Sequence, residues 1–278
     1  MEIKASDVKA LREKTGAGMM ECKKALQECN GDAKEAEKYL KEKGLAAVEK
    51  RASRATSEGI IVVKTTDSKA VMVELTCETD FVAKNADFIA VGDKIAETAL
   101  AKGYTDVQKE LSDMVLDLAT RVRENMGLRR LTAVQAGSGE YIAHYVHSDK
   151  KTGVIVVLKS DKSAVFADKV FQEFAYDCCL HAAAFTPLYV KKEDVDAAYI
   201  DEQLEVFRGQ VAELQKPDNV KEGIVKGKLN KHLAEICFLE QAFVKDDKVS
   251  VAAKMKEVGK QLGANISLSK LVLWQLGQ

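Results

Sequence analysis

Residues 60–77 read IIVVKTTDSKAVMVELTC, and this stretch decides the class of fold. Two runs rich in Val and Ile flank residues 65–69, whose polar side chains are typical of a turn, so we expect a β-hairpin. Beyond it, apolar residues recur every three or four positions over 88–99 and 107–122, which predicts two amphipathic helices. Residues 128–134 then predict a third strand.

The same order of elements recurs further along the chain. Residues 141–147 and 154–158 predict a second hairpin, and an apolar stripe over 170–178 predicts the helix after it. A later helical stripe covers 225–239, and residues 266–273 predict a closing strand. The sequence therefore predicts an α+β fold with two related halves.

Residues 1–44 predict a module of three short helices that precedes the sheet. The second helix stops at Asn30-Gly31, and the third begins with the capping-box pattern Asp32-x-x-Glu35. We expect the third helix to end at Gly44, with a polar helical linker over residues 45–57.

An apolar stripe of heptad type lies within residues 188–227, and Pro217 interrupts it. We expect an antiparallel helical hairpin that projects from the body. The regions expected are thus a helical module with its linker at 1–54, a first core half at 55–139, a second core half at 140–187 and 228–262, a coiled-coil insertion at 188–227, and a C-terminal module at 263–278.

Charge and composition exclude several classes of protein. Lys and Arg number 42 against 43 Asp and Glu, whereas a dedicated nucleic-acid binder shows a basic excess. The sequence has no apolar run of about eighteen residues and no N-terminal stretch of signal-peptide type, so we expect no membrane association. The six cysteines form no CxxC pair, which favours a cytoplasmic location.

The polar residue types offer little for catalysis or metal binding. His144 and His147 lie three apart on an expected strand and point to opposite faces. Residues 178–181 include two cysteines and a histidine, but a metal site needs about four converging ligands. Residues 223–229 resemble a phosphate-binding loop only with the wrong spacing. We predict no metal, no cofactor and no enzymatic activity.

Residues 78–85, ETDFVAKN, follow the second strand and admit two interpretations. In one, Thr79 or Asp80 caps a helix and Phe81 packs against it. In the other, Phe81 is an exposed aromatic side chain that inserts into a partner, where its burial contributes ~1.5–3 kcal/mol. The residues alone favour the first interpretation and leave both open.

Two long runs carry a family resemblance. Residues 11–26, LREKTGAGMMECKKAL, and residues 74–84, ELTCETDFVAK, resemble the two signatures of the elongation factor Ts family. Similarity continues at Arg129-Arg130, at residues 145–147 and over residues 239–246, so that nearly the whole chain is covered. The resemblance implies a guanine-nucleotide exchange factor of translation elongation in the cytoplasm, whose partner is the GTPase elongation factor Tu.

The resemblance also implies a fold and a set of contacts. The fold is a three-helix module like a ubiquitin-associated domain, two related subdomains and a C-terminal module, with a coiled-coil element through which some members self-associate. Phe81 would insert between helices of the GTPase, and Asp80 would disturb the groups that hold Mg²⁺. The wedge segment is thus Thr79, Asp80, Phe81 and Val82. The other implied contacts are Leu11, Arg12, Met19, Met20, Lys23, Val122, Arg123 and His147.

The alternative is a scaffold for the ribosome or a viral polymerase that uses the same surfaces. Its phosphate contacts would be basic residues, but no aromatic side chains interleave with them as stacking platforms, so we expect no direct nucleic-acid binding. Salt-sensitive RNA binding would favour this alternative. A small-molecule enzyme ranks third. The basic residues concerned are Lys50, Arg51, Arg54, Arg121, Arg123, Arg129 and Arg130.

Overall fold

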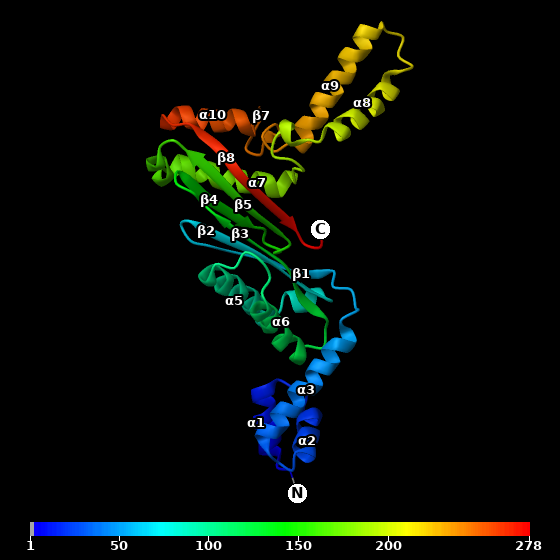
Figure 1. Ribbon diagram of the computed structural model, residues 1–278, viewed down its shortest axis with the longest axis vertical. Helices are drawn as coiled ribbons and strands as arrows, with labels where there is room; N and C mark the ends of the chain where they lie inside the picture. The colour runs from blue at the N-terminus through cyan, green and yellow to red at the C-terminus, as the bar shows by residue number, and fades with distance from the viewer. Residues whose placement is uncertain (1–2) are drawn as a thin grey trace. The chain divides into compact units, whose positions relative to one another are not determined.

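A computed structural model describes residues 3–278, so that residues 1 and 2 of the expected module 1–54 lie outside the described part. The chain forms two compact units, and each draws on separate stretches of sequence. Unit 1 contains the residues up to 134 together with 148–151 and 275–278, and unit 2 contains 135–147 and 152–274. Both units combine helices with a small sheet, so the predicted α+β class is confirmed (Figure 1).

Unit 1 begins with three helices, α1 (Ala5–Thr15), α2 (Met19–Glu28) and α3 (Ala33–Arg51). Asp32 caps α3, because its side chain accepts hydrogen bonds from the backbone N–H groups of Lys34 and Glu35. The buried core of the module is small and consists of Val8, Leu11, Cys22, Ala25, Leu26 and Ala36.

Helix α3 does not end at Gly44, as the sequence predicted, but continues to Arg51. A Cβ added at Gly44 would lie 2.8 Å from the Cβ of Thr120. Glycine is needed there because two helices approach closely, and not because the helix stops. The expected linker is therefore largely the second half of one helix.

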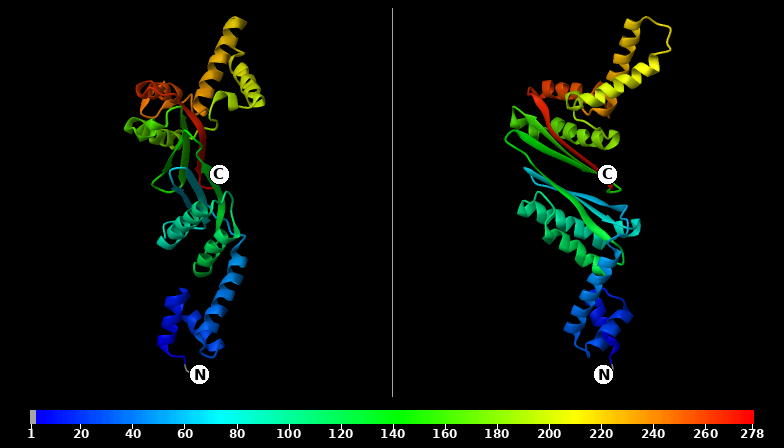
Figure 2. Two further views of the ribbon diagram at one scale, coloured as in Figure 1. Left: turned by 60° about the vertical axis from the view of Figure 1, so that its left-hand side comes forward. Right: turned by 45° about the vertical axis from the view of Figure 1, so that its right-hand side comes forward.

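The three-stranded sheet of unit 1 has the order β1-β2-β3. Helices α5 and α6 supply apolar side chains to the core that the sheet shares with them, and Figure 2 shows both helices beside it. The middle strand is buried along nearly its whole length, which explains its continuous apolar run. The elements are β1 (Glu58–Thr65), β2 (Lys69–Cys77), α4 (Asp80–Ala83), α5 (Ala86–Lys102), α6 (Lys109–Arg121) and β3 (Met126–Gln135).

Apart from an inserted helical hairpin within residues 197–236 and the short β6–β7 pair, unit 2 repeats the order strand, strand, helix, helix, strand, with the sheet order β4-β5-β8. Helix α7 packs on β4 and β5, and α10 packs on α7. The sequence did not predict α10. The elements are β4 (Glu140–Val146), β5 (Thr152–Ser160), η1 (Ser163–Ala167), α7 (Lys169–Phe185), β6 (Ala242–Phe243), β7 (Asp246–Ser250), α10 (Val251–Leu262) and β8 (Ile266–Gln275).

The insertion of unit 2 is a helical hairpin of α8 (Ala197–Val211) and α9 (Asp218–Ile236), preceded by the short η2 (Lys192–Asp194). Figure 1 shows it extending away from α7 and the sheet of this unit. Helix α9 is continuous, so the expected boundary at residue 227 falls inside it. Strand β8 belongs to the sheet, so 263–274 are part of unit 2 and no separate module.

The hairpin keeps apolar side chains at its surface, since Val206, Leu214 and Val220 are each about two-fifths exposed or more. Self-association through residues 188–227 stays a prediction. Within residues 3–278, no helix combines the length and the apolar character that crossing a bilayer requires.

Candidate functional site

The wedge segment (Thr79–Val82) starts a single helical turn, α4, directly after β2. Thr79 is its N-cap, and its hydroxyl accepts a hydrogen bond from the Val82 backbone N–H at 3.4 Å. Ala83 is buried in the core of unit 1 and Val82 packs partly against the same core. On so short a turn this orientation points Phe81 the other way, and its ring is 83% exposed.

Both interpretations of this segment therefore contain a correct part. Thr79 caps a helix, as the first required, but Phe81 does not pack against that helix. An aromatic ring this exposed is unusual, because burying it would contribute ~1.5–3 kcal/mol. The protein holds a large apolar side chain in solvent on a turn whose other side is anchored in the core.

Two carboxylates from different parts of the chain fix the start of α4. Glu124, in the connection between α6 and β3, accepts hydrogen bonds from the Thr79 backbone N–H at 3.0 Å and from the Thr79 hydroxyl at 2.5 Å. In the reverse direction, Glu78 accepts a bond from the Asn125 backbone N–H at 2.5 Å. Sequence reasoning missed Glu124, because a partner 45 positions from Thr79 leaves no periodic signal.

Asp80 lies beside the exposed ring and carries its own counter-ion. The Lys84 ammonium lies 2.6 Å from its carboxylate and lowers the pKa of Asp80, so the group is ionised at neutral pH. A hollow of about 620 Å³ adjoins it, and further charged side chains, including the pair Lys151–Glu58 at 2.7 Å, line the hollow. Charged side chains therefore line a hollow beside Asp80, together with apolar residues such as Ile60 and Ile89.

The helical module presents most of its expected contact residues. Met19 and Met20 are 51% and 75% exposed, and Arg12 and Lys23 are exposed as well. Leu11 is the exception: it is 3% exposed and packs in the core of the module, so we remove it from the candidate interface. Exposed methionines suit an adaptable contact surface.

The remaining expected contacts come from residues outside the helical module. Arg123 is exposed and its guanidinium lies 3.0 Å from the Glu21 carboxylate, which ties the α6–β3 connection to α2. Val122 is half-buried against the core of unit 1. His147 belongs to unit 2, where it follows β4, is exposed, and shares a 2.9 Å hydrogen bond with the Tyr145 hydroxyl.

The expected phosphate-binding arginines are in part occupied within the protein. Glu74 is fully buried in β2, and its carboxylate lies 2.8 Å from Arg129 and 2.6 Å from Arg130. The Gly277 backbone N–H donates to it at 3.0 Å, and Arg130 also donates to the carbonyl of Gln275. Burial would raise the pKa of Glu74, but Arg129, the Gly277 amide and Arg130 outweigh it, and the pKa is lowered.

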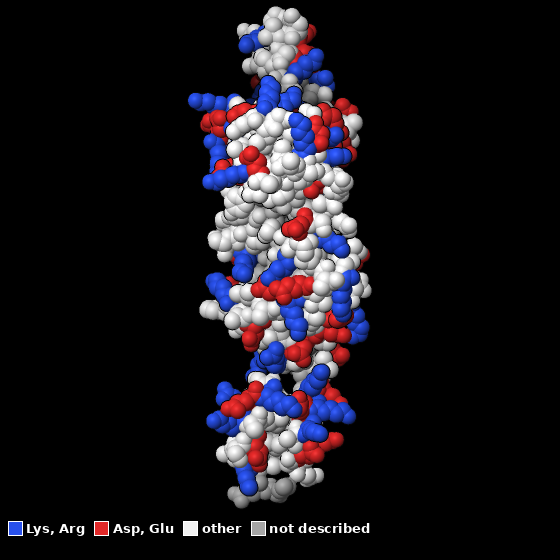
Figure 3. Space-filling model, turned by 90° about the vertical axis from the view of Figure 1, so that its left-hand side faces the viewer, with Lys and Arg blue, Asp and Glu red and all other residues white. Residues whose placement is uncertain are grey.

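The surface charges do not form a basic track on the face drawn in Figure 3, where Lys and Arg are interleaved with Asp and Glu. Several expected basic residues have acidic neighbours: Arg54 lies 3.4 Å from Glu78, and Arg121 lies 3.9 Å from Asp117. Because interleaved charges cancel beyond a Debye length, this face offers no stripe for a phosphate backbone.

The cluster at 178–181 serves helix packing. Cys178, Cys179 and His181 are all fully buried, and burial raises the pKa of both thiols. His181 uses both ring nitrogens: Nδ1 accepts from the Val244 backbone N–H at 3.2 Å, and Nε2 lies 3.0 Å from the Gln241 side-chain oxygen. Since Nδ1 accepts, Nε2 carries the proton and donates to Gln241.

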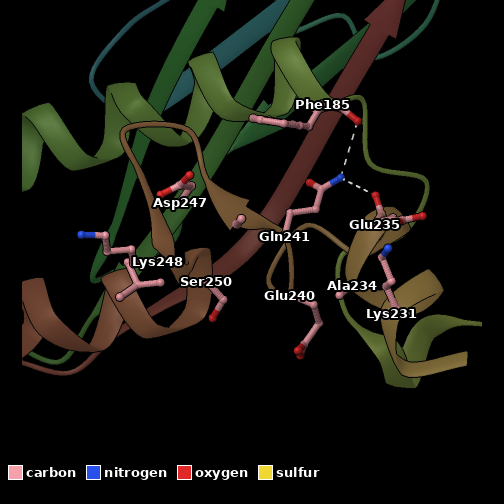
Figure 4. A pocket seen from close by; sticks show the side chains of 11 residues that line it. Phe185, Lys231, Ala234, Glu235, Glu240, Gln241, Asp247, Lys248 and Ser250 are labelled. Atoms are coloured by element: carbon pink, nitrogen blue, oxygen red, sulfur yellow. Dashed lines mark hydrogen bonds between the residues drawn. The ribbon is translucent and has the colours of Figure 1, made fainter. Parts of the chain in front are cut away.

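Gln241 extends this network to the edge of a hollow of about 520 Å³ (Figure 4). Its side-chain nitrogen donates to the carbonyl of Glu235 at 2.8 Å and approaches that of Phe185 at 3.5 Å. The network therefore joins the ends of α7 and α9 to the loop before β7. It needs His181 neutral, because a second ring proton would oppose the Val244 N–H.

Acid is expected to destabilise unit 2 through His181. Burial lowers the pKa of His181 below its ordinary value near 6.5, although the bond to Gln241 opposes this. As the pH falls, His181 is protonated in the unfolded chain before it is protonated in the folded protein. The stability that neutral His181 contributes is therefore present above its ordinary pKa and is lost as the pH falls below it. Urea unfolding at about pH 7.5 and about pH 5.5 should show the loss.

The matched variants are His181→Gln and, as a control with an exposed ring, His147→Gln. The free energy of unfolding should depend less on pH in His181→Gln than in the unmodified protein, whereas His147→Gln should keep the original dependence. Equal dependence in all three proteins would contradict the prediction.

Comparisons with known proteins agree on one family. The family model described as Elongation factor TS matches residues 78–278. Over its full length the chain is 76% identical to the elongation factor Ts of Treponema denticola and 60% identical to that of Treponema pallidum, and each match covers 99% of the relative. A more distant relative, the elongation factor Ts of Nitratidesulfovibrio vulgaris, is 39% identical over the whole chain and 97% of its own length.

Proposed function

Because the chain belongs to the elongation factor Ts family, we propose that it binds the GTPase elongation factor Tu in its GDP-bound state and promotes release of the nucleotide. Membership of this family makes the protein a translation elongation factor. The proposal concerns how it acts. It assigns the action to the wedge segment, and it needs no proton transfer and no covalent intermediate.

The observation that carries the proposal is the exposed ring of Phe81, 83% accessible on a turn anchored by Ala83. A ring held in this way can enter an apolar gap of a partner without first leaving a core of its own. Its burial there would contribute ~1.5–3 kcal/mol, and that free energy is available to hold the partner in a conformation with weaker nucleotide affinity.

Asp80 supplies the electrostatic part of the proposal. In GTPases Mg²⁺ bridges phosphate oxygens and neutralises their charge, so a disturbance of its ligands removes a large share of nucleotide affinity. The ionised Asp80 is next in sequence to the inserting ring and would compete for the groups that hold the ion. Each ~1.4 kcal/mol of lost nucleotide affinity gives about tenfold faster release if association is unchanged.

The test is a chase of fluorescent GDP from elongation factor Tu at increasing concentrations of this protein. We expect a saturable increase in the release rate. Thermodynamic linkage adds a quantitative requirement: GDP must weaken binding of this protein to the GTPase by the same factor by which this protein weakens GDP. Calorimetry with nucleotide-free and GDP-bound elongation factor Tu measures that factor independently.

Failure of either measurement would count against the proposal. A release rate that does not respond to the protein would remove it outright. A faster release combined with equal affinities for the two forms of the GTPase would mean that GDP association is accelerated as much as GDP release, and would contradict the proposed loss of nucleotide affinity.

A further inference from the structure

Glu124 is placed to control the wedge although it does not belong to it. Its carboxylate accepts two hydrogen bonds from Thr79, one from the backbone N–H at 3.0 Å and one from the hydroxyl at 2.5 Å. The same hydroxyl accepts from the Val82 backbone N–H at 3.4 Å. A chain of hydrogen bonds thus runs from Glu124 through the cap into the helical turn that presents Phe81.

A second contact crosses the first. The Glu78 carboxylate accepts from the backbone N–H of Asn125 at 2.5 Å, and the Asn125 side chain donates to the carbonyls of Ala52 and Arg54. Residues 78–79 follow β2 and residues 124–125 precede β3. Each pair supplies one carboxylate that accepts hydrogen bonds from the other pair. Two such contacts fix both the position and the direction of the chain as it enters α4.

We infer that Glu124 is a positioning residue for the wedge, and that its carboxylate holds Thr79 so that Asp80 and Phe81 meet the partner in one orientation. The inference rests on the proposed exchange function. Without this anchor the turn would keep the Ala83 and Val82 contacts with the core, the Glu78–Asn125 bond and its own weak cap, but no side chain would hold Thr79 from the β3 side. A four-residue helix is too short to be stable alone, so its orientation must come from outside it.

The charge of Glu124 matters as well as its shape. An ionised carboxylate accepts both bonds at once, and bonds to an ionised acceptor are about twice as strong as neutral ones. Glutamine at this position keeps the size but offers one good acceptor. Alanine removes both acceptors. We therefore expect Glu124→Ala to slow GDP release more than Glu124→Gln.

The experiment compares Glu124→Ala with a matched variant, Glu110→Ala. Glu110 lies in the same unit and also accepts two contacts, from Lys102 at 2.6 Å and from the Tyr104 hydroxyl at 3.0 Å, but it does not touch α4. In the saturated complex, Glu124→Ala loses both charge-assisted hydrogen bonds to Thr79 and should slow GDP release by about tenfold or more. Glu110→Ala should release GDP at the unmodified rate.

Two further readouts separate positioning from general loss of structure. Hydrogen exchange of the amides of 82–84 in the free protein should become about tenfold faster in Glu124→Ala, while affinity for nucleotide-free elongation factor Tu changes less than about threefold. Thr79→Val removes the hydroxyl bond to Glu124 but keeps the backbone N–H bond, so it should also slow release, and Thr79→Ser should restore it. The double variant Thr79→Val/Glu124→Ala should slow release by less than the product of the two single effects.

Unchanged release and unchanged amide exchange in Glu124→Ala would overturn the inference while leaving the exchange function intact, provided Phe81→Ala slows release. If Phe81→Ala has no effect, the wedge is removed from the mechanism instead, and amide exchange at 82–84 still decides whether Glu124 holds the turn. Additive effects of the two single variants would also count against a shared anchor.

Discussion

Replacement of Phe81 by alanine is expected to slow GDP release from elongation factor Tu by about 10- to 100-fold, the largest effect of any single substitution on function. The ring contributes ~1.5–3 kcal/mol when it is buried in a partner, and ~1.4 kcal/mol corresponds to a factor of ten. The free energy of unfolding should change little, because Phe81 is 83% exposed and substitutions at such surface positions usually change it by no more than about 0.5 kcal/mol.

The measurement is the fluorescent-GDP chase with both proteins at saturation, together with thermal unfolding of the free protein. Leu188→Ala is the matched control, since Leu188 is a large apolar side chain of unit 2 that is 71% exposed. It should leave GDP release unchanged. Phe81→Leu, which keeps most of the apolar area, should lie between the two. Release by Phe81→Ala at the unmodified rate would remove the wedge from the mechanism.

The largest effect on stability is expected at Glu74. Its removal as Glu74→Ala leaves the guanidinium groups of Arg129 and Arg130 without their shared counter-ion, and breaking a buried ion pair costs about 3–5 kcal/mol. Both arginines keep some contact with solvent, with 39% and 30% of their side-chain area exposed, so we expect about 3 kcal/mol. Urea unfolding followed by circular dichroism measures this loss.

The pH and a control variant sharpen this prediction. Because the pKa of Glu74 is lowered in the folded protein, its contribution is present above the ordinary carboxyl value and is lost as the pH falls through the lowered one. Glu97→Ala removes an exposed partner of Lys64 in the same unit and should have a small effect. A loss at Glu74 no larger than at Glu97 would contradict the prediction.

Local patterns predicted most of the elements, because their physical cause is local. The turn residues at 65–69 and the apolar runs beside them correspond to β1 and β2, and the stripe over 88–99 corresponds to α5. The recurrence of this order also appears in the structure. Helix α10 was missed although its buried residues Val251, Met255 and Val258 have the spacing of an amphipathic helix.

The sequence could not predict the features that depend on tertiary contacts. Gly44 looks like a helix stop, and only the approach of Thr120 explains it. Arg129 and Arg130 look like phosphate ligands until Glu74 is found between them. The exposure of Phe81 depends on Ala83 facing the core, which no spacing rule decides for a single helical turn. Leu11 was predicted as a partner contact from the family signature alone. Its burial follows from the packing of α1, α2 and α3, which the signature does not describe.

Unit 1 takes one polar contact of the Glu74 site from a residue far along the chain. The Gly277 amide that completes the Glu74 site is 203 positions further along the chain, so a nascent chain on the ribosome has to make all of unit 2 first. Until then only Arg129 and Arg130 can balance the buried charge. Truncations before residue 277 should therefore show their defect around Glu74 in unit 1, about 200 positions earlier in the chain.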